Sequence, residues 1–362
     1  MGPHLRRPAV ELFRIPTDRP ESDGTLAWNA TTVVLVQLRA GRTTGLGYTY
    51  ASPAAAAVVH HTLADVIEGL DAFDLPACWA AMRRSIRNFG RPGMCSMAIA
   101  AVDLALWDLK AKLLGLPLAK LLGQVREQVP IYGSGGFTSY SIEELQEQLG
   151  GWAAEGFTAV KMKVGRDPGH DLERVRAARA AIGNRVALYV DANGAYSRQQ
   201  ALQFAGQFAA EGVTWFEEPV SSDDLAGLRW LRERAPAGME IAAGEYGYDL
   251  AYFRSMLAAE AVHVLQADIT RCAGVSEFFR VAGLCSAFQT PLSAHTAPAA
   301  HLAPACALER FRNIEYFHDH ARIEDLLFDG APNPRHGVMA PDLSRPGLGL
   351  ELKHREARRW AA

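Results

Sequence analysis

Two lysines placed two residues apart are the most distinctive chemical feature of this sequence. The chain has only six lysines, and Lys161 and Lys163 share the apolar run Ala-Val-Lys-Met-Lys-Val, residues 159–164. On a β-strand, residues i and i+2 point to the same face, so this run predicts two amines projecting together into a buried space. Burying two ammonium groups is costly unless counter-charges lie nearby, and a buried lysine of lowered pKa is useful in catalysis.

The elements that position these lysines follow a repeating pattern from about residue 129 onward. Short apolar runs, expected to be strands, alternate with amphipathic segments, expected to be helices. The expected strands are 129–137, 159–165, 186–192, 213–219, 240–245, 262–269, 290–295 and 313–317. The expected helices are 141–155, 171–182, 198–211, 224–234, 250–259, 275–288 and 298–308. This alternation predicts an α/β protein with a (β/α)8 barrel. The rival, an open doubly wound sheet, often begins with a GxGxxG turn, which the Gly-Ser-Gly-Gly segment at 133–136 does not match.

The first part of the chain reads differently and predicts a separate α+β domain, residues 1–126, ahead of a barrel at 127–319. Strands are expected at 9–16, 31–38 and 45–50, and helices at 53–69, 76–87 and 94–115. The polar segment 17–30 is expected to be a loop, either a lid or disordered. The tail, 320–362, is rich in Pro and Gly, has no barrel strand left to supply, and is expected to return to the N-terminal domain.

Three acids stand at the predicted carboxyl ends of adjacent barrel strands, where barrel enzymes carry their chemistry. They are Asp191, Glu217 and Glu245. Any one of them alone could simply pair with an arginine, but three converging carboxylates cannot stay ionised together without a cation. Oxygen-only ligands favour a hard divalent ion, Mg2+ before Mn2+, whereas zinc would recruit His or Cys. Glu218 should point to the other face of its strand, and we do not expect it to be a ligand.

Asp268 and His295 stand on the next two strands and predict an acid–base pair. A carboxylate that accepts from one imidazole nitrogen fixes the tautomer and raises the basicity of the ring. An isolated histidine would more often be a buried side chain satisfied by backbone, and we interpret His301 in that way. For His295, the position across the barrel mouth from the lysines favours catalysis.

Composition excludes several classes of protein. The net charge is −3 with no long basic run, so nucleic acid is not an expected partner. The five cysteines are scattered without CxxC spacing, which argues against disulfides or a zinc site and predicts reduced thiols in the cytoplasm. No apolar run is long enough to cross a bilayer, and the N-terminus does not resemble a signal peptide.

Taken together, these motifs resemble the enolase superfamily and, within it, the mandelate racemase subgroup of mandelate racemase/muconate lactonizing enzyme-like proteins. The matching stretches are Val-Lys-Met-Lys-Val-Gly, Val-Asp-Ala-Asn-Gly, Phe-Glu-Glu-Pro, Ala-Gly-Glu, Gln-Ala-Asp-Ile-Thr-Arg-Cys-Ala-Gly and Ser-Ala-His, and the helical text at 98–110 resembles the family's capping domain. The muconate lactonising and dipeptide epimerase groups carry a catalytic lysine on the sixth strand. Residues 262–270 contain none, and the pair of Asp268 and His295 stands in its place.

The resemblance implies abstraction of the α-proton of a carboxylate substrate, with Mg2+ on Asp191, Glu217 and Glu245. Lys163 would be the general base on one face, and its pKa would have to fall from about 10.4 to roughly 7–8. Lys161 and the metal would supply the positive charge that lowers it. His295, held by Asp268, would act on the opposite face. Glu315, if it is protonated or shares a proton, would hydrogen-bond the substrate carboxylate. Candidates for substrate specificity are Asp23, Trp28, Tyr48 and Tyr50 in the capping domain.

Two acid–base groups allow two outcomes, dehydration of a sugar acid (aldonate or aldarate) to a 2-keto-3-deoxy acid, or racemisation or epimerisation. The subgroup favours dehydration, and this preference is an analogy. A Schiff-base aldolase that uses Lys161 or Lys163 is a rival that leaves the three acids unexplained. An inactive binding module is a further rival, although every expected catalytic position is filled. Apolar capping-domain helices predict a homo-oligomer, and the resemblance to the family implies a size from dimer to octamer.

Overall fold

Eight parallel strands close into a barrel in the computed structural model, which describes residues 2–362. The strands follow one another around the ring in chain order, and β11 pairs back with β4 to close it. They are β4 (Val129–Gly135), β5 (Ala159–Lys163), β6 (Ala187–Asp191), β7 (Val213–Glu217), β8 (Glu240–Ala243), β9 (Val264–Ala267), β10 (Leu292–Ala294) and β11 (Phe311–Phe317). The predicted fold class is confirmed.

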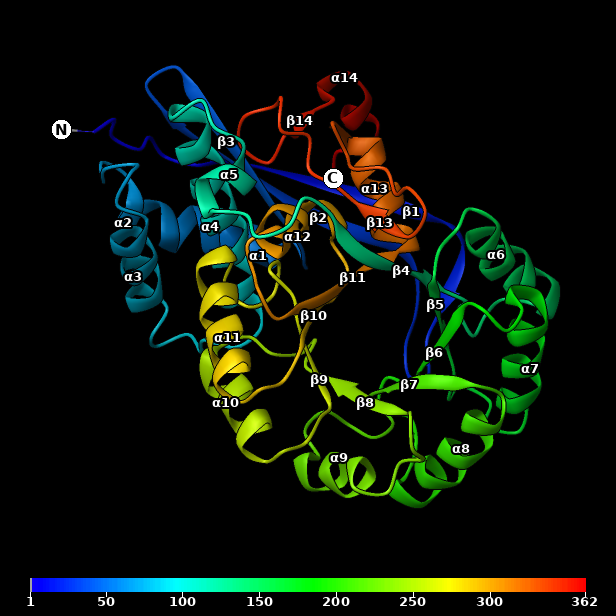
Figure 1. The fold of residues 1–362 in the computed structure, drawn as a ribbon. Coiled ribbons are helices and arrows are strands. Elements are labelled where there is room, and N and C mark those ends of the chain that lie inside the picture. Colours follow the sequence, from blue (N-terminus) through cyan, green and yellow to red (C-terminus); the bar gives the residue numbers. More distant parts are fainter. Residues whose placement is uncertain (1) are drawn as a thin grey trace.

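Helices between the strands cover the outside of the barrel, as the arc from α6 to α11 in Figure 1 shows. They are α6 (Ile142–Ala154), α7 (Asp171–Ile182), α8 (Arg198–Ala210), α9 (Leu225–Arg232), α10 (Leu250–Ala258), α11 (Val275–Ala287) and α12 (Pro298–Cys306). Capping boxes start two of them. Ser141 and Glu144 exchange side-chain to backbone hydrogen bonds at α6, and Ser197 and Gln200 do so at α8. These bonds satisfy N–H groups that a helix leaves free at its start.

Alternate strand residues point into the barrel, and this alternation aims the two lysines inward. Tyr189 and Trp215 stack inside the barrel with ring centroids 5.1 Å apart. Lys161 is the register partner of Tyr189, and Lys163 is the partner of Asp191 one step further along. Because the side-chain period of a strand is two residues, the aromatic pair lies at the level of Lys161 and one step below Lys163 and Asp191.

The N-terminal domain is an antiparallel sheet of β1 (Ala9–Ser22), β2 (Ala27–Ala40) and β3 (Thr43–Tyr50), covered by helices. The helices are α1 (Ala54–Val58), η1 (Val59–Leu63), α2 (Ala64–Ile67), α3 (Leu75–Ser85), α4 (Met94–Leu113) and α5 (Leu118–Leu122). Helix α4 lies so close to β3 that a Cβ on Gly47 would sit 2.2 Å from the Ala101 carbonyl oxygen. The helix predicted at 53–69 is divided by the π-helical turn η1.

The prediction of a loop at 17–30 is wrong, because β1 and β2 continue through most of that segment as a long hairpin. The ladder shifts register between Pro16 and Glu21, and β1 is an edge strand, where prolines are tolerated. The hairpin tip docks on the barrel: Thr138 N donates to the Ser22 carbonyl oxygen (2.8 Å), and a Cβ on Gly24 would meet the Ala192 carbonyl oxygen at 2.4 Å. The tip therefore lies over the carboxyl ends of the strands.

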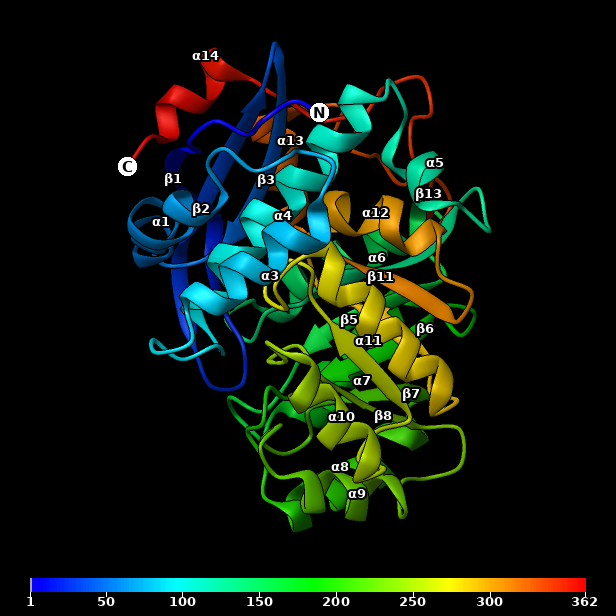
Figure 2. The same ribbon diagram turned by 90° about the vertical axis from the view of Figure 1, so that its left-hand side faces the viewer.

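The tail returns to the N-terminal domain, as the expected fold class required (Figure 2). Its elements are α13 (His318–Leu327), β12 (Phe328–Asp329), β13 (Val338–Met339), β14 (Glu351–Leu352), α14 (His354–Ala357) and η2 (Arg358–Trp360). Ala362 N donates to the Leu12 carbonyl oxygen (3.0 Å). The tail supplies none of the eight barrel strands, as expected, but it adds the two-residue strand β13, which pairs antiparallel with the start of β4. The division of the chain at 126 and 319 stays a prediction.

Among residues 2–362, no helix combines the length and the apolar character that a bilayer span requires.

Candidate active site

The predicted site residues gather at one end of the barrel, at or just beyond the carboxyl ends of the strands. Lys163, Asp191 and Glu217 are the last residues of β5, β6 and β7. Glu245 and Asp268 were expected inside strands, but they follow the ends of β8 and β9. His295 likewise follows β10. The strands end early because the backbone turns away at positions such as Gly244, whose φ is +134°. Side chains on these short turns still face the barrel mouth.

The carboxylates of Asp191, Glu217 and Glu245 converge, with one oxygen from each lying within 4.8 Å of the others. All three side chains are buried. Burial, together with the charge of Asp191, raises the pKa of Glu217 well above its ordinary value. Glu245 Oε2 is buried and accepts no hydrogen bond. These are the properties of carboxylates that are short of positive charge.

The charges around the triad also indicate that these carboxylates are short of positive charge. Three cationic side chains, Lys161, Lys163 and Arg271, face a larger number of acids. The acids are Asp191, Glu217, Glu218, Glu245, Asp268 and Glu315, all of them buried. An all-oxygen donor set with excess negative charge fits a hard divalent cation, so the residues present match the predicted metal site.

Lys161 is fully buried and is held by two carboxylates. Its Nζ lies 2.5 Å from Glu217 Oε1 and 2.8 Å from Glu315 Oε1. Burial acts to lower the pKa of Lys161, but the charges of Glu217 and Glu315 raise it well above the ordinary value. Lys161 is therefore a fixed positive charge at the floor of the site.

Lys163 lies at the edge of the triad, with its Nζ 2.5 Å from Asp191 Oδ2. Burial acts to lower the pKa of Lys163, but the charge of Asp191 outweighs it, so the pKa lies above the ordinary value. The sequence analysis expected a lowered pKa for Lys163, so the observed shift has the opposite direction. The physical reason is that the carboxylate of Asp191 is neutralised by the lysine itself. If a divalent cation neutralises Asp191, burial and the charge of Lys161 remain, and both lower the pKa of Lys163.

Glu315 lies next to Lys161 and accepts hydrogen bonds from Ser134 Oγ (2.6 Å) and Thr296 N (3.0 Å). Burial acts to raise the pKa of Glu315, but Lys161 lowers it below the usual range. In this arrangement the ammonium group of Lys161 favours the charged carboxylate of Glu315, and a hydrogen bond from Glu315 to the substrate carboxylate stays a prediction.

His295 and Asp268 form the predicted pair. His295 Nδ1 lies 2.9 Å from Asp268 Oδ2, and the other ring nitrogen, Nε2, lies 3.3 Å from Glu245 Oε2. Burial acts to raise the pKa of Asp268, but the hydrogen bond and charge of His295 lower it below its usual range. His301 is structural, as expected: Ile269 N donates to its Nε2 (2.9 Å), and its Nδ1 lies 3.0 Å from the Ala297 carbonyl oxygen.

A cavity of about 630 Å3, the catalytic cavity, lies between the triad and the N-terminal domain. Lys163, Glu245, Asp268 and His295 line its barrel side. The specificity candidates Asp23, Trp28 and Tyr50 line the opposite side. Lys163 borders Asp191 and His295 borders Glu245, so the two predicted acid–base groups flank the triad from different sides.

Tyr48 is not part of this cavity, and its interpretation as a substrate contact is corrected. Its side chain is fully buried, and its hydroxyl donates to Glu324 Oε1 (2.6 Å) on α13. Tyr48 therefore joins the N-terminal sheet to the tail.

Sequence reasoning missed several lining residues. Arg271 Nη1 lies 3.3 Å from Glu245 Oε1, and Arg271 Nε lies 3.6 Å from Asp268 Oδ2, so one guanidinium joins the triad to the dyad. Asn193, Tyr246 and Tyr248 also line the cavity. Their positions in the sequence could have identified them, since each follows a strand-end acid within three residues.

Comparison with known proteins agrees with this arrangement. The signature described as "Enolase C-terminal domain-like" matches residues 144–357, and that of the "Mandelate racemase / muconate lactonizing enzyme, N-terminal domain" matches residues 11–123. The 3,6-anhydro-alpha-L-galactonate cycloisomerase of Streptomyces coelicolor is 33% identical over 360 residues, which cover 96% of this chain and 97% of the relative.

Two solved structures are close in fold. A mandelate racemase/muconate lactonizing enzyme-like protein from Rubrobacter xylanophilus has a TM-score of 0.98 and 56% identity, covering 99% of this chain and 100% of its own. L-Talarate dehydratase from Polaromonas sp. JS666, complexed with Mg and L-glucarate, has a TM-score of 0.90 and 29% identity, covering 99% of this chain and 97% of its own. The chain therefore belongs to the mandelate racemase/muconate lactonizing enzyme family of the enolase superfamily.

Proposed function

We propose that this protein is an Mg2+-dependent enzyme that removes the α-proton of a sugar acid and dehydrates it to a 2-keto-3-deoxy acid. The observation that carries the proposal is that Lys163 and the pair of His295 and Asp268 flank an oxygen-only triad in one cavity. The dehydratase and the cycloisomerase among the relatives support a sugar-acid substrate.

Asp191, Glu217 and Glu245 would hold the Mg2+, and the bound ion supplies positive charge to the substrate carboxylate as the enolate develops. Lys163 removes the proton from the α-carbon on one face. Lys161, fixed between Glu217 and Glu315, keeps positive charge close to Lys163 and favours its neutral form.

His295 completes the reaction from the other side of the triad. Its Nε2 donates a proton to the β-hydroxyl, the carbon–oxygen bond breaks, and water leaves while the enolate electrons form the new double bond. The resulting enol becomes the 2-keto acid by gaining a proton at the β-carbon. Asp268 accepts from Nδ1 and keeps the ring oriented through this transfer.

Racemisation or epimerisation is the second candidate, and the two acid–base groups themselves favour it. If His295 returns its proton to the α-carbon rather than to a leaving hydroxyl, the configuration of that carbon inverts. The same side chains serve both reactions, so the substrate's β-substituent decides between them.

The test is incubation of the Mg2+-loaded protein with a panel of sugar acids in D2O, followed by NMR. Release of a 2-keto-3-deoxy acid from one of them is the expected result. Deuterium at the α-carbon without loss of water would show that the protein is a racemase or an epimerase and not a dehydratase. Absence of both signals with every acid, in protein that binds Mg2+, would contradict the proposal.

We further propose a reducing, cytoplasmic location and a homo-oligomer of two to eight chains. Five buried cysteines are free thiols, which supports the location. Leu114 (47% exposed) and Leu116 (40% exposed) follow the end of α4 and supply apolar surface for a contact between copies. Light scattering after size-exclusion chromatography tests the assembly, and a monomer at micromolar concentration would contradict it.

A further inference from the structure

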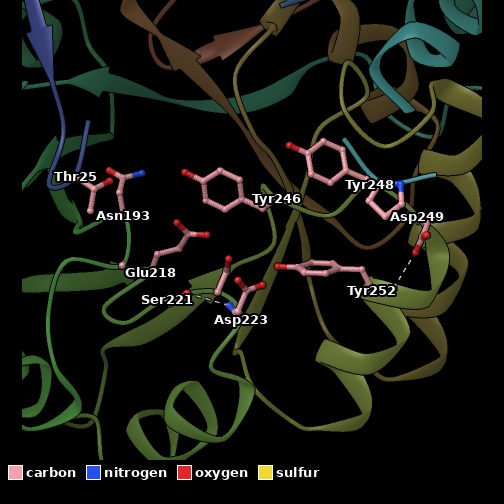
Figure 3. A pocket seen from close by; sticks show the side chains of 12 residues that line it. Thr25, Asn193, Glu218, Ser221, Asp223, Tyr246, Tyr248, Asp249 and Tyr252 are labelled. Atoms are coloured by element: carbon pink, nitrogen blue, oxygen red, sulfur yellow. Dashed lines mark hydrogen bonds between the residues drawn. The ribbon is translucent and has the colours of Figure 1, made fainter. Parts of the chain in front are cut away.

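A second cavity of about 640 Å3, the side cavity, lies beside the catalytic one. The two share Asn193, Tyr246 and Tyr248, so the two cavities adjoin at these side chains. Most of the side-cavity wall comes from the loops that follow β6, β7 and β8, with Tyr252 from α10 and Thr25 and Pro92 from the N-terminal domain. Figure 3 shows the side chains that line it.

Hydroxyl and carboxylate groups dominate the side cavity. Tyr246, Tyr248 and Tyr252 line it, and Glu218 and Asp223 lie across from them in Figure 3. The hydroxyl of Tyr252 and Oε1 of Glu218 are buried and make no hydrogen bond. Buried polar atoms in proteins are normally paired, so these two are suited to the hydroxyl groups of a ligand. Tyrosine rings also offer flat apolar surface for the carbon skeleton of a sugar.

No lysine, arginine or histidine lines the side cavity within the part of the chain that the structure describes. The catalytic cavity has four such residues, and each already has a protein partner. Lys163 pairs with Asp191, or is the neutral base when a cation occupies the triad, and His295 pairs with Asp268. Arg271 pairs with Glu245 and Asp268.

The fourth, His320, stacks on Tyr50 with ring centroids 3.5 Å apart. Burial lowers the pKa of His320 to about 3, so this ring is uncharged near neutral pH. The metal triad accounts for one substrate carboxylate. A second carboxylate would lie beside the carboxylates of Glu218 and Asp223 with no cation to pair with, and that arrangement is unfavourable.

We propose that the substrate carries one carboxylate only, and that its uncharged, hydroxylated tail lies in the side cavity against Tyr246 and Tyr252. This inference rests on the proposed function and narrows it from sugar acids in general to monocarboxylic ones. A dicarboxylic acid of the same chain length is then excluded by charge, not by size.

The test compares matched acids that differ only at the far end, galactonate with galactarate and gluconate with glucarate. The measurement is α-proton exchange and product formation by the Mg2+-loaded protein. We expect kcat/KM for the accepted monoacid to exceed that for its diacid by at least about 100-fold. Equal or better turnover of the diacid would overturn this inference and leave the proposed function standing. No exchange with either member of any pair would count against the proposed function instead.

A positive charge introduced into the side cavity gives a second, independent test of where the substrate tail lies. Ser221 lines this cavity from an exposed position, so Ser221→Arg should fold normally. It should raise the ratio of diacid to monoacid kcat/KM by about tenfold or more, whereas Ser221→Gln, which adds bulk without charge, should not. If both substitutions leave the ratio unchanged, the tail does not lie in the side cavity and the placement is wrong.

Discussion

His295 is held at one ring nitrogen and presented to the cavity at the other. Its Nδ1 lies 2.9 Å from Asp268 Oδ2, while its Nε2 lies 3.3 Å from Glu245 Oε2. Asp268 is fixed in turn, because Thr270 donates to Oδ1 from both its backbone N and its hydroxyl, each at 2.7 Å. This order of contacts ties the acid–base function of His295 to the carboxylate of Asp268.

Asp268→Asn should therefore lower kcat by roughly 10²–10⁴-fold, because the amide no longer fixes the tautomer of His295. Mg2+ affinity should change less than kcat, since Asp268 is outside the triad. The melting temperature should fall, because Arg271 loses a buried ion-pair partner. Steady-state kinetics beside calorimetric Mg2+ titration would show this. An unchanged kcat would mean that His295 works without the dyad.

Mg2+ should stabilise the folded protein through the triad. At an Mg2+ concentration of about 100 times Kd, the free energy of unfolding should rise by about 2.7 kcal/mol. Glu245→Gln should abolish this increase in a thermal or urea denaturation series. Glu240→Gln is the matched control, because Glu240 begins the same strand and pairs with Arg312 at the opposite end. Equal Mg2+ responses in the two variants would exclude Glu245 as a ligand.

The buried carboxyl of Glu324 should make stability depend on pH. Burial raises the pKa of Glu324 from 4.5 to about 8, so between these values the folded state binds a proton that the unfolded state has lost. The stability that Glu324 contributes is complete below pH 4.5 and is lost as pH rises through 8, by up to about 1.4 kcal/mol per pH unit.

Glu324→Gln should flatten this dependence in urea unfolding measured between pH 5 and pH 8. The amide can still accept from Ala299 N through its oxygen and donate to the Tyr48 hydroxyl through its nitrogen, so the fold should persist. An identical slope in the parent protein and the variant would show that Glu324 is ionised in the folded state.

Substitutions at Tyr48 and Trp28 should separate effects on stability from effects on substrate binding. Tyr48→Phe removes a buried hydrogen bond to Glu324 and should lower the free energy of unfolding by about 1–3 kcal/mol with KM unchanged. Trp28→Ala, in the wall of the catalytic cavity, should raise KM. Urea unfolding and steady-state kinetics on both variants test this. A raised KM for Tyr48→Phe with an unchanged free energy of unfolding would show that Tyr48 contributes to substrate binding.

The sequence allowed the barrel and its strand-end chemistry to be predicted because both depend on local periodicity. Lys161 and Lys163 stand two apart in an apolar run, and Asp191 and Glu217 end the next two strands, so their inward direction follows from the strand period alone.

Features that depend on distant partners could not be predicted. Tyr48 and Tyr50 lie on the same face of β3, yet Tyr48 meets Glu324, which lies 276 residues further along the chain. The polar composition of segment 17–30 indicated a loop, whereas β1 and β2 continue through most of it, with a register shift between Pro16 and Glu21. The direction of the shift in the Lys163 pKa could not be predicted either. It depends on whether Asp191 is neutralised by the lysine or by another cation.

The most direct test of the account follows α-proton exchange and water loss in D2O with the sugar acid that the protein dehydrates. Lys163→Ala should lower both signals by roughly 10²–10⁴-fold, whereas His295→Asn should keep deuterium exchange at the α-carbon and lower water loss by a similar factor. If His295→Asn loses α-proton exchange, or if Lys163→Ala keeps it, Lys163 is not the base and His295 is not the acid for the leaving hydroxyl, and the central claim is wrong.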